Sequence, residues 1–216
     1  MKIEKRELEL PRGWDGKLAF ALDNVFTKEE CEKYIADSEA RGYELALVNI
    51  GGGRQKQMTD VRNSSRNIWD SKEEVQKMFS RIKDYIPEVW KDRKCLGLNE
   101  RLRFLRYDPG EYFKPHLDGS YVRENGERSY ITVQIYLNEG FEGGSTTFMS
   151  WDENERVEYV PKTGSVLIFQ HDILHEGSQL IKGRKYSIRT DVMYSLETVQ
   201  ELKKGKKSKL LSWLPW

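Results

Sequence analysis

The chain has only three histidines, and one of them stands two residues before an aspartate in the stretch YFKPHLDG, residues 112–119. Side chains two apart on a β-strand point to the same face, so His116 and Asp118 could both bind one metal ion. A third ligand would come from His171 or His175, which follow the hydrophobic run SVLIFQ. Two imidazoles and one carboxylate leave three coordination positions open, which suits non-haem Fe(II) and dioxygen chemistry. Without a thiolate, this ligand set argues against structural zinc.

An H-x-D pair alone is weak evidence, because a polar pair at a strand end is the commoner meaning. Lys185, ten residues after His175, strengthens the metal interpretation. An Fe(II) oxygenase that uses a 2-oxo acid must hold the far carboxylate with a cation, and Ser187 could add a hydroxyl hydrogen bond. Arg189 shares this strand face and could supplement the lysine, whereas Arg184 should point the other way. A lysine near a strand start is, however, more often simply solvated.

Two amphipathic helices are predicted before residue 100. The first covers residues 27–41, begins at a capping box formed by Thr27 and Glu30, and ends at Gly42. The second begins with the same device at Ser71 and places five apolar residues at helical spacing before a proline: Val75, Met78, Phe79, Ile82 and Ile86. Helices with one apolar face must pack on another element, so we expect both to support a sheet.

Short strand-like runs fill the chain from residue 101 onward, separated by turn signals such as DPGE, NEGFEGG and KTG. They predict an all-β sandwich or barrel. Between the two helices, the glycine triplet at residues 51–53 predicts a mobile loop and then a short extended piece, which could border a pocket. The last run alternates cleanly, with one face carrying Tyr186, Ile188, Thr190, Val192 and Tyr194 and the other Lys185, Ser187, Arg189 and Asp191.

Composition narrows the functional class. With 216 residues, 38% of them hydrophobic, the chain can bury one sizeable core, and we expect one globular domain. The 36 Lys and Arg residues nearly balance the 35 Asp and Glu residues, which gives no general electrostatic reason to bind nucleic acid. No run approaches the roughly 18 apolar residues of a membrane span. Cys31 and Cys95 have no metal-binding spacing, which favours a reducing compartment, the cytoplasm or the nucleus.

Three longer segments carry a family resemblance: RFLRYDPGEYFKPHLD, ITVQIYLNEGFEGGSTTF and GSVLIFQHDILHEGSQLIKGRKYSIRTDVMY. Together with LDNVFTKEECEKYI and DVRNSSRNIW, they strongly resemble the 2-oxoglutarate- and Fe(II)-dependent dioxygenases, specifically the prolyl 4-hydroxylase-like branch, over residues 18–195. The resemblance implies an α+β, mainly β fold, a double-stranded β-helix (jelly roll, cupin-like). Residues 101–195 would be its oxygenase core and residues 1–100 a helical and extended support region of the same domain. The composition of residues 196–216 predicts a basic, solvated tail, with a nuclear signal or a partner-binding helix as alternatives.

The resemblance also implies roles for individual residues. Iron would be bound by His116, Asp118 and His175, which form the catalytic centre, and His171 would lie outside the ligand set. The co-substrate would be held by a second set: Tyr107, Thr146, Lys185, Ser187 and Arg189. Within this set, the tyrosine could instead be a strand aromatic in the core, and the threonine an ordinary β-former. Candidate substrate-binding residues are Arg62, Arg128, Tyr121 and Trp69.

The implied reaction consumes 2-oxoglutarate and dioxygen, with ascorbate as a reductant, and oxidises an unactivated carbon–hydrogen bond while releasing succinate and carbon dioxide. The branch predicts a prolyl residue in a peptide or protein as the substrate. A free amino acid or another small metabolite is the alternative, and a catalytically inactive binding module of the same fold is a third class. The sequence leaves open the substrate itself, the position and stereochemistry of hydroxylation, and the oligomeric state.

Overall fold

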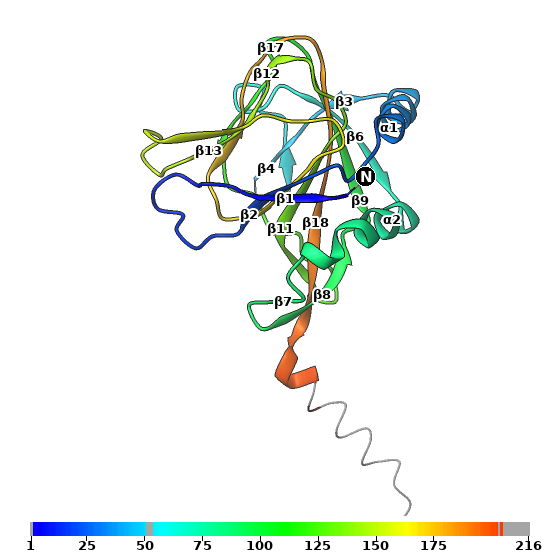
Figure 1. Ribbon diagram of the computed structural model, residues 1–216, viewed down its shortest axis with the longest axis vertical. Coiled ribbons are helices and arrows are strands. Elements are labelled where there is room, and N and C mark those ends of the chain that lie inside the picture. Colours follow the sequence, from blue (N-terminus) through cyan, green and yellow to red (C-terminus); the bar gives the residue numbers. More distant parts are fainter. Residues whose placement is uncertain (1, 51–53, 203, 205–216) are drawn as a thin grey trace, which may run out of the picture.

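The computed structural model describes residues 2–50, 54–202 and 204 of the chain. Within these residues, a ten-stranded antiparallel major sheet packs against a four-stranded antiparallel minor sheet (Figure 1). The major sheet contains, in spatial order, β1 (Glu4–Glu7), β2 (Ala19–Asp23), β15 (Val166–Gln170), β11 (Arg128–Tyr136), β18 (Lys185–Thr198), β9 (Arg101–Tyr107), β6 (Ser65–Asp70) and β3 (Glu44–Leu45), with β8 (Arg93–Leu98) also paired to β18 and β7 (Val89–Trp90) to β8.

The minor sheet lies across an apolar core from the major sheet, as a jelly roll requires. Its strands are β10 (Phe113–His116), β16 (His175–Gly177), β13 (Thr146–Met149) and β14 (Arg156–Tyr159). Two small antiparallel pairs complete the strands of the described residues: β4 (Val48–Asn49) with β5 (Gln55–Lys56), and β12 (Glu142–Gly143) with β17 (Leu180–Lys182). The predicted double-stranded β-helix with supporting helices is confirmed.

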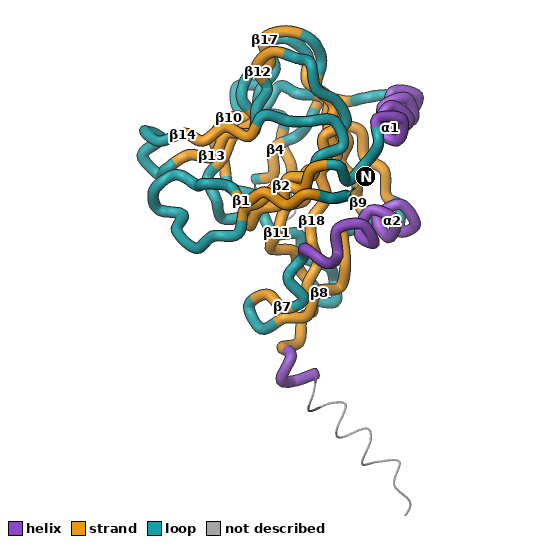
Figure 2. The backbone as a smooth tube through the Cα atoms, viewed as in Figure 1, coloured by secondary structure: helices purple, strands orange, loops and turns teal. Residues whose placement is uncertain are grey.

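Both predicted helices exist, and both cover the outer face of the major sheet, on the opposite side of the molecule from β13 and β14 (Figure 2). Helix α1 (Lys28–Arg41) has the predicted capping box, in which the Thr27 hydroxyl accepts from the Glu30 N–H and the Glu30 carboxylate accepts from the Thr27 N–H. In the described part of the chain, no helix is long and apolar enough to cross a membrane.

Helix α2 (Lys72–Ile82) is shorter than predicted and has only half of a capping box. The Ser71 hydroxyl accepts from the Glu74 N–H, but the Ser71 N–H donates to the Glu100 carbonyl, which ties the start of α2 to the turn before β9. A 3-10 turn, η1 (Lys83–Tyr85), follows, and Ile86 is extended. The prediction that Ile86 continues the helix is therefore wrong, because the residue before a proline is driven out of the α region.

Strand β18 divides the molecule into an apolar side and a polar side, as its alternation predicted. Tyr186, Ile188 and Val192 belong to the core under the helices, which also contains Met78 of α2. Burying each such side chain contributes about 1.5–3 kcal/mol of transfer free energy. The opposite face of β18 looks between the two sheets and carries Lys185, Ser187, Arg189 and Asp191.

The N-terminal region contributes more strands than the sequence suggested. Strand β2 lies between β1 and β15 and is buried on both faces, so it lacks the alternation by which a strand is usually found. The division of the chain at residues 100 and 195 stays a prediction. The glycine triplet at 51–53 and the tail residues 203 and 205–216 lie outside the described residues.

Gly164, in the turn before β15, fastens the N-terminal segment to the major sheet. The N–H groups of Val25 and Phe26 donate to the Gly164 carbonyl at 3.2 and 3.1 Å. Its φ of +75° favours glycine, and a Cβ at this position would lie 2.0 Å from the Phe26 carbonyl oxygen. Both the backbone conformation and the close approach therefore require glycine.

Gly16 provides a matched control, since its φ is +71° but no atom lies within 4 Å of the position of a Cβ. Gly16→Ala should lower the free energy of unfolding by about 1–2 kcal/mol, from backbone strain alone. Gly164→Ala should cost about 1–3 kcal/mol more, because the clash adds to the strain. Urea denaturation of both variants measures this difference, and equal losses would contradict the close approach.

Candidate active site

Three side chains of the described residues form a cluster that could hold a metal ion: His116, Asp118 and His175. The two histidines are register partners on β10 and β16 of the minor sheet. One potential ligand atom from each residue lies within 4.8 Å of the other two. The Asp118 Oδ1 atom is 3.7 Å from His116 Nε2, and Oδ2 is 3.7 Å from His175 Nε2. Because metal–ligand bonds are about 2.0–2.2 Å long, a single ion between them could reach all three.

Each imidazole is prepared to bind a metal through Nε2. His116 Nδ1 lies 2.8 Å from the Lys114 carbonyl oxygen, and His175 Nδ1 lies 2.9 Å from that of Ile173. These carbonyls accept a hydrogen bond, so the proton belongs on Nδ1 and the Nε2 lone pair faces the cluster. Burial lowers the pKa of His175 to about 3, which keeps this imidazole neutral, as a metal ligand must be.

Asp118 reaches the cluster from a loop, not from a strand. Strand β10 ends at His116, and the Asp118 N–H donates to the His171 carbonyl at 2.9 Å. The prediction that the H-x-D pair lies along one strand is therefore wrong for the aspartate. Its side chain is only 3% exposed, and it accepts from the Thr132 hydroxyl at 2.5 Å and from Arg189 at 3.0 Å. Burial alone would raise the pKa of Asp118, but the charge of Arg189 helps to hold it well below its usual range.

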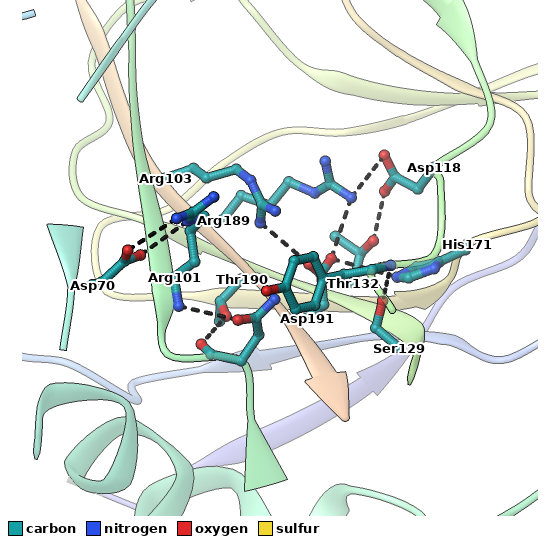
Figure 3. A network of polar contacts seen from close by, with 12 residues as sticks. Asp70, Arg101, Arg103, Asp118, Ser129, Thr132, His171, Arg189, Thr190 and Asp191 are labelled. Carbon is teal, nitrogen blue, oxygen red and sulfur yellow. Dashed lines mark hydrogen bonds and ion pairs between the residues drawn. The ribbon is translucent and has the colours of Figure 1, made fainter. Parts of the chain in front are cut away.

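A buried polar network continues behind the cluster (Figure 3). Asp191 lies 3.2 Å from Arg189, 3.2 Å from Arg103 and 3.4 Å from His171 Nε2. His171 thus has a place in this network and not in the cluster of potential ligands. Arg189 contacts two aspartates, and its four-residue separation from Lys185 corresponds to about 13 Å along the strand. Arg189 lines the same cavity as Lys185, and its part in holding the co-substrate stays a prediction.

The other end of the same cavity contains Lys185, which is 2% exposed. Its Nζ donates to the Gly144 carbonyl at 2.6 Å and lies 5.1 and 5.5 Å from the ring centroids of Tyr107 and Tyr136. The Tyr136 hydroxyl shares a 2.7 Å hydrogen bond with that of Thr146. Among the described residues, no carboxylate lies within 4.0 Å of Lys185, and burial lowers its pKa to about 7. A buried ammonium group of this kind is a site for an anion.

Comparison with known proteins identifies this arrangement. Residues 102–190 match the model of the 2OG-Fe(II) oxygenase superfamily. Prolyl 4-hydroxylase 5 of Arabidopsis thaliana is 27% identical over 205 residues, which are 81% of this chain and 67% of that protein. Residues 102–190 therefore form a domain of the 2OG-Fe(II) oxygenase superfamily. Among the proteins of this superfamily, the chain resembles the prolyl 4-hydroxylases.

Solved structures of prolyl hydroxylases share the fold. The viral collagen prolyl hydroxylase of Paramecium Bursaria Chlorella virus-1, solved with 2-oxoglutarate, has a TM-score of 0.58 at 20% identity and covers 85% of this chain and 99% of its own. A Trichoplax adhaerens prolyl hydroxylase, solved with a peptide from the oxygen degradation domain of hypoxia inducible factor, has a TM-score of 0.61 at 16% identity and covers 83% and 84%.

A 2OG-Fe(II) oxygenase requires Fe(II), 2-oxoglutarate and dioxygen, and the cavity fits the first two. Two imidazoles and a buried carboxylate are a ligand set for Fe(II). The unpaired Lys185 fits the far carboxylate of 2-oxoglutarate. Ser187 is fully buried, and its hydroxyl accepts from Gln134 at 2.8 Å, so it reaches the cavity through another side chain.

Several lining residues were not predicted from the sequence. Gln134, Phe113 and Phe169 line the cavity, and the Phe113 ring stacks on the His116 ring with centroids 3.6 Å apart. The run ITVQIY contained a usable signal for Gln134, because Thr132, Gln134 and Tyr136 alternate with Ile131, Val133 and Ile135, which face the helices.

The four candidate substrate-binding residues lie in different parts of the structure, and one of them lines the cavity. Arg62 lines the cavity. Tyr121 lies in the loop after Asp118, where its N–H donates to the Ser129 hydroxyl at 2.9 Å, and it does not line the cavity. The other two residues also lie outside the cavity lining, and their assignment stays a prediction. Trp69 packs on the ring of Phe104, on the helix-covered face of the major sheet, and Arg128 is exposed at the start of β11, over the ring of Tyr130.

Removing one member of the cluster should remove tight iron binding. Asp118→Ala should weaken Fe(II) binding by at least about 100-fold, since it deletes the anionic ligand, a larger loss than the 10–100-fold typical of outer-shell changes. His171→Gln, which alters the histidine outside the cluster, should stay within about tenfold of the wild type. Anaerobic equilibrium dialysis measures both, and tight binding by the alanine variant would exclude Asp118 as a ligand.

The low pKa of Lys185 predicts a pH dependence for the co-substrate. Only the ammonium form can pair with a carboxylate, so 2-oxoglutarate binding should be strongest below pH 7 and weaken by up to about tenfold per pH unit above it. Lys185→Arg keeps the charge at all these pH values and should remove the dependence. The measurement is anaerobic titration of the Fe(II)-loaded protein between about pH 6 and pH 9. A wild-type affinity that stays constant over this range would show that Lys185 does not titrate in the cavity.

Proposed function

We propose that this oxygenase hydroxylates a prolyl residue in a peptide or protein. The observation that carries the proposal is one cavity that joins the His116, Asp118 and His175 cluster to the buried Lys185 in a chain related to prolyl 4-hydroxylases. One structural neighbour is a prolyl hydroxylase solved with a peptide bound, which supports a peptide substrate.

The roles of the residues follow from their positions. His116, Asp118 and His175 hold Fe(II), while Lys185 and Tyr107 hold the far carboxylate of 2-oxoglutarate. With dioxygen, these bound groups supply the oxidising chemistry: one oxygen atom enters the substrate C–H bond, and the other enters succinate as 2-oxoglutarate loses carbon dioxide. The protein keeps Asp118 ionised and the His175 imidazole neutral, so that these two ligands are ready before the metal arrives.

The aromatic lining serves a different purpose from the polar lining. Phe113 packs on His116, and Phe169 packs edge-on against His175 with centroids 4.7 Å apart. Both rings line the cavity and displace water from the ligand side chains. Excluding water protects a reactive site from side reactions and strengthens the electrostatic interactions within it. We therefore assign to these rings the shielding of the reaction, with no direct part in its chemistry.

A reducing compartment, the cytoplasm or the nucleus, remains our proposal for the location, with ascorbate as the reductant. Cys31 and Cys95 are free, and burial raises the pKa of both thiols, that of Cys31 to about 12, so neither is prepared to form a disulfide. Cell fractionation with an antibody to the protein tests the location directly.

A substrate panel tests the proposed function. The enzyme, supplied with Fe(II), 2-oxoglutarate and ascorbate in air, should add one oxygen atom to proline-containing peptides and form succinate in equal amount. Asp118→Ala is the control and should lower both products by at least about 100-fold, because it removes an iron ligand. Mass spectrometry of the peptides and a succinate assay provide the two readouts. Hydroxylation of free amino acids only would contradict the peptide substrate and leave the reaction class intact.

A further inference from the structure

Arg62 occupies the cavity beside the metal cluster, although it comes from a different part of the chain. The backbone of Arg62 forms an isolated antiparallel β-bridge with that of Phe113. The guanidinium carbon of Arg62 lies 4.6 Å from the centroid of the Phe113 ring. That ring stacks on His116, so a single aromatic ring separates Arg62 from a potential iron ligand. Arg62 is only 8% exposed and lines the cavity.

The charge of Arg62 is not compensated by the protein. Other well-buried arginines have acidic partners within 4.0 Å: Arg66 has Glu44, Arg103 has Asp191, and Arg189 has Asp118 and Asp191. In the described part of the chain, no carboxylate lies within that distance of Arg62. Burial lowers the pKa of Arg62; the nearby Tyr107 side chain opposes this effect, and the positive charge of Arg189 adds to it. Buried charges are normally paired, so the partner of Arg62 should come from outside the chain.

Iron and 2-oxoglutarate do not supply that partner. Fe(II) and doubly charged 2-oxoglutarate together add no net charge to the cavity. Asp118 is paired with Arg189, and Asp191 is paired with Arg103 and Arg189. Glu176, the other acid in the lining, is paired with Arg156. Lys185 is assigned to the far carboxylate of 2-oxoglutarate, so Arg62 is the lining cation that keeps no anionic partner among the described residues. The loaded cavity therefore keeps a positive charge on the side of Arg62.

We propose that the substrate of this enzyme carries a carboxylate close to the carbon that is hydroxylated, and that Arg62 binds this carboxylate. The inference rests on the proposed function and restricts its prolyl substrates to those that carry a nearby carboxylate. The Nε–H of Arg62 already donates to the Ser64 hydroxyl at 3.0 Å, which fixes the plane of the guanidinium group. The Tyr107 hydroxyl also interacts with this guanidinium group, and the terminal nitrogens can bind a carboxylate in the cavity that both residues line.

Two sources of the carboxylate are compatible with a prolyl substrate: the α-carboxylate of a terminal or free proline, and the side chain of a neighbouring acidic residue. Two matched pairs of compounds distinguish them. N-acetylproline is compared with N-acetylprolinamide, and acetyl-Asp-Pro-amide with acetyl-Asn-Pro-amide. Within each pair, only the negative charge changes. For each compound, kcat/KM for hydroxylation is measured, and binding to the anaerobic protein loaded with Fe(II) and 2-oxoglutarate is measured by calorimetry.

The wild-type enzyme should prefer the charged member of at least one pair by about 10–100-fold, the range expected for a charge-assisted hydrogen-bonded pair. Arg62→Gln should reduce this preference to within about threefold, while Arg62→Lys should keep part of it. Arg101→Gln is the matched control, because Arg101 pairs with Asp70 on the surface and lies outside the cavity. It should keep the full preference.

Three outcomes would overturn the inference: no preference for charge in the wild type, a preference that persists in Arg62→Gln, or a loss in Arg62→Gln that is confined to 2-oxoglutarate affinity. In each case hydroxylation of the neutral prolyl compounds would leave the proposed function standing. If no prolyl compound is hydroxylated, the proposed function fails, and the calorimetric preference for the charged member still decides the role of Arg62.

Discussion

The rest of the site depends on the buried carboxylate of Asp118, whose negative charge must be compensated by its neighbours. A charge with 3% exposure has to be compensated, and the compensation comes from both sheets: Thr132 on β11 and Arg189 on β18 reach it from the major sheet, and the two histidines face it from the minor sheet. The ion pair therefore connects the layers of the jelly roll at its mouth. The same pair keeps the carboxylate ionised, so the requirement for stability and the requirement for a metal ligand coincide.

Elsewhere in the cavity, buried charges are not all compensated by side chains of opposite charge. Asp118 and Asp191 have arginine partners, whereas among the described residues Lys185 contacts a carbonyl and two aromatic rings and no carboxylate. Burying a cation without an anion costs free energy in the empty protein, and the ligand recovers it on binding. An unpaired buried cation thus lowers the stability of the empty protein but raises its affinity for an anion. Buried cations without an acidic partner therefore indicate where anionic ligands bind. Charge complementarity of this kind selects for anionic ligands before any shape complementarity acts.

Spacing along the chain made part of this site predictable. Period-two alternation on β18 placed Lys185 and Arg189 on one face, and the spacing of Lys185 from the H-x-D pair and His175, together with the family resemblance, suggested a 2-oxo acid. Contacts between strands were not predictable, because they depend on register: Arg189 meets Asp118 only once β18 is paired beside β11. Trp69 shows the same limit, since a shift of one residue on β6 would turn it from the helices toward the cavity.

Arg62 shows what the fold adds to a candidate taken from the sequence. The family resemblance suggested a role in substrate binding, but nothing nearby in the sequence marks this arginine as buried. The structure brings it against Phe113 through a single β-bridge and leaves it without an acidic neighbour in the described part of the chain. A cation–π contact offsets only a small part of the desolvation of a guanidinium group. The remaining cost is hard to explain for a purely structural residue, but it is expected for one whose partner is the substrate.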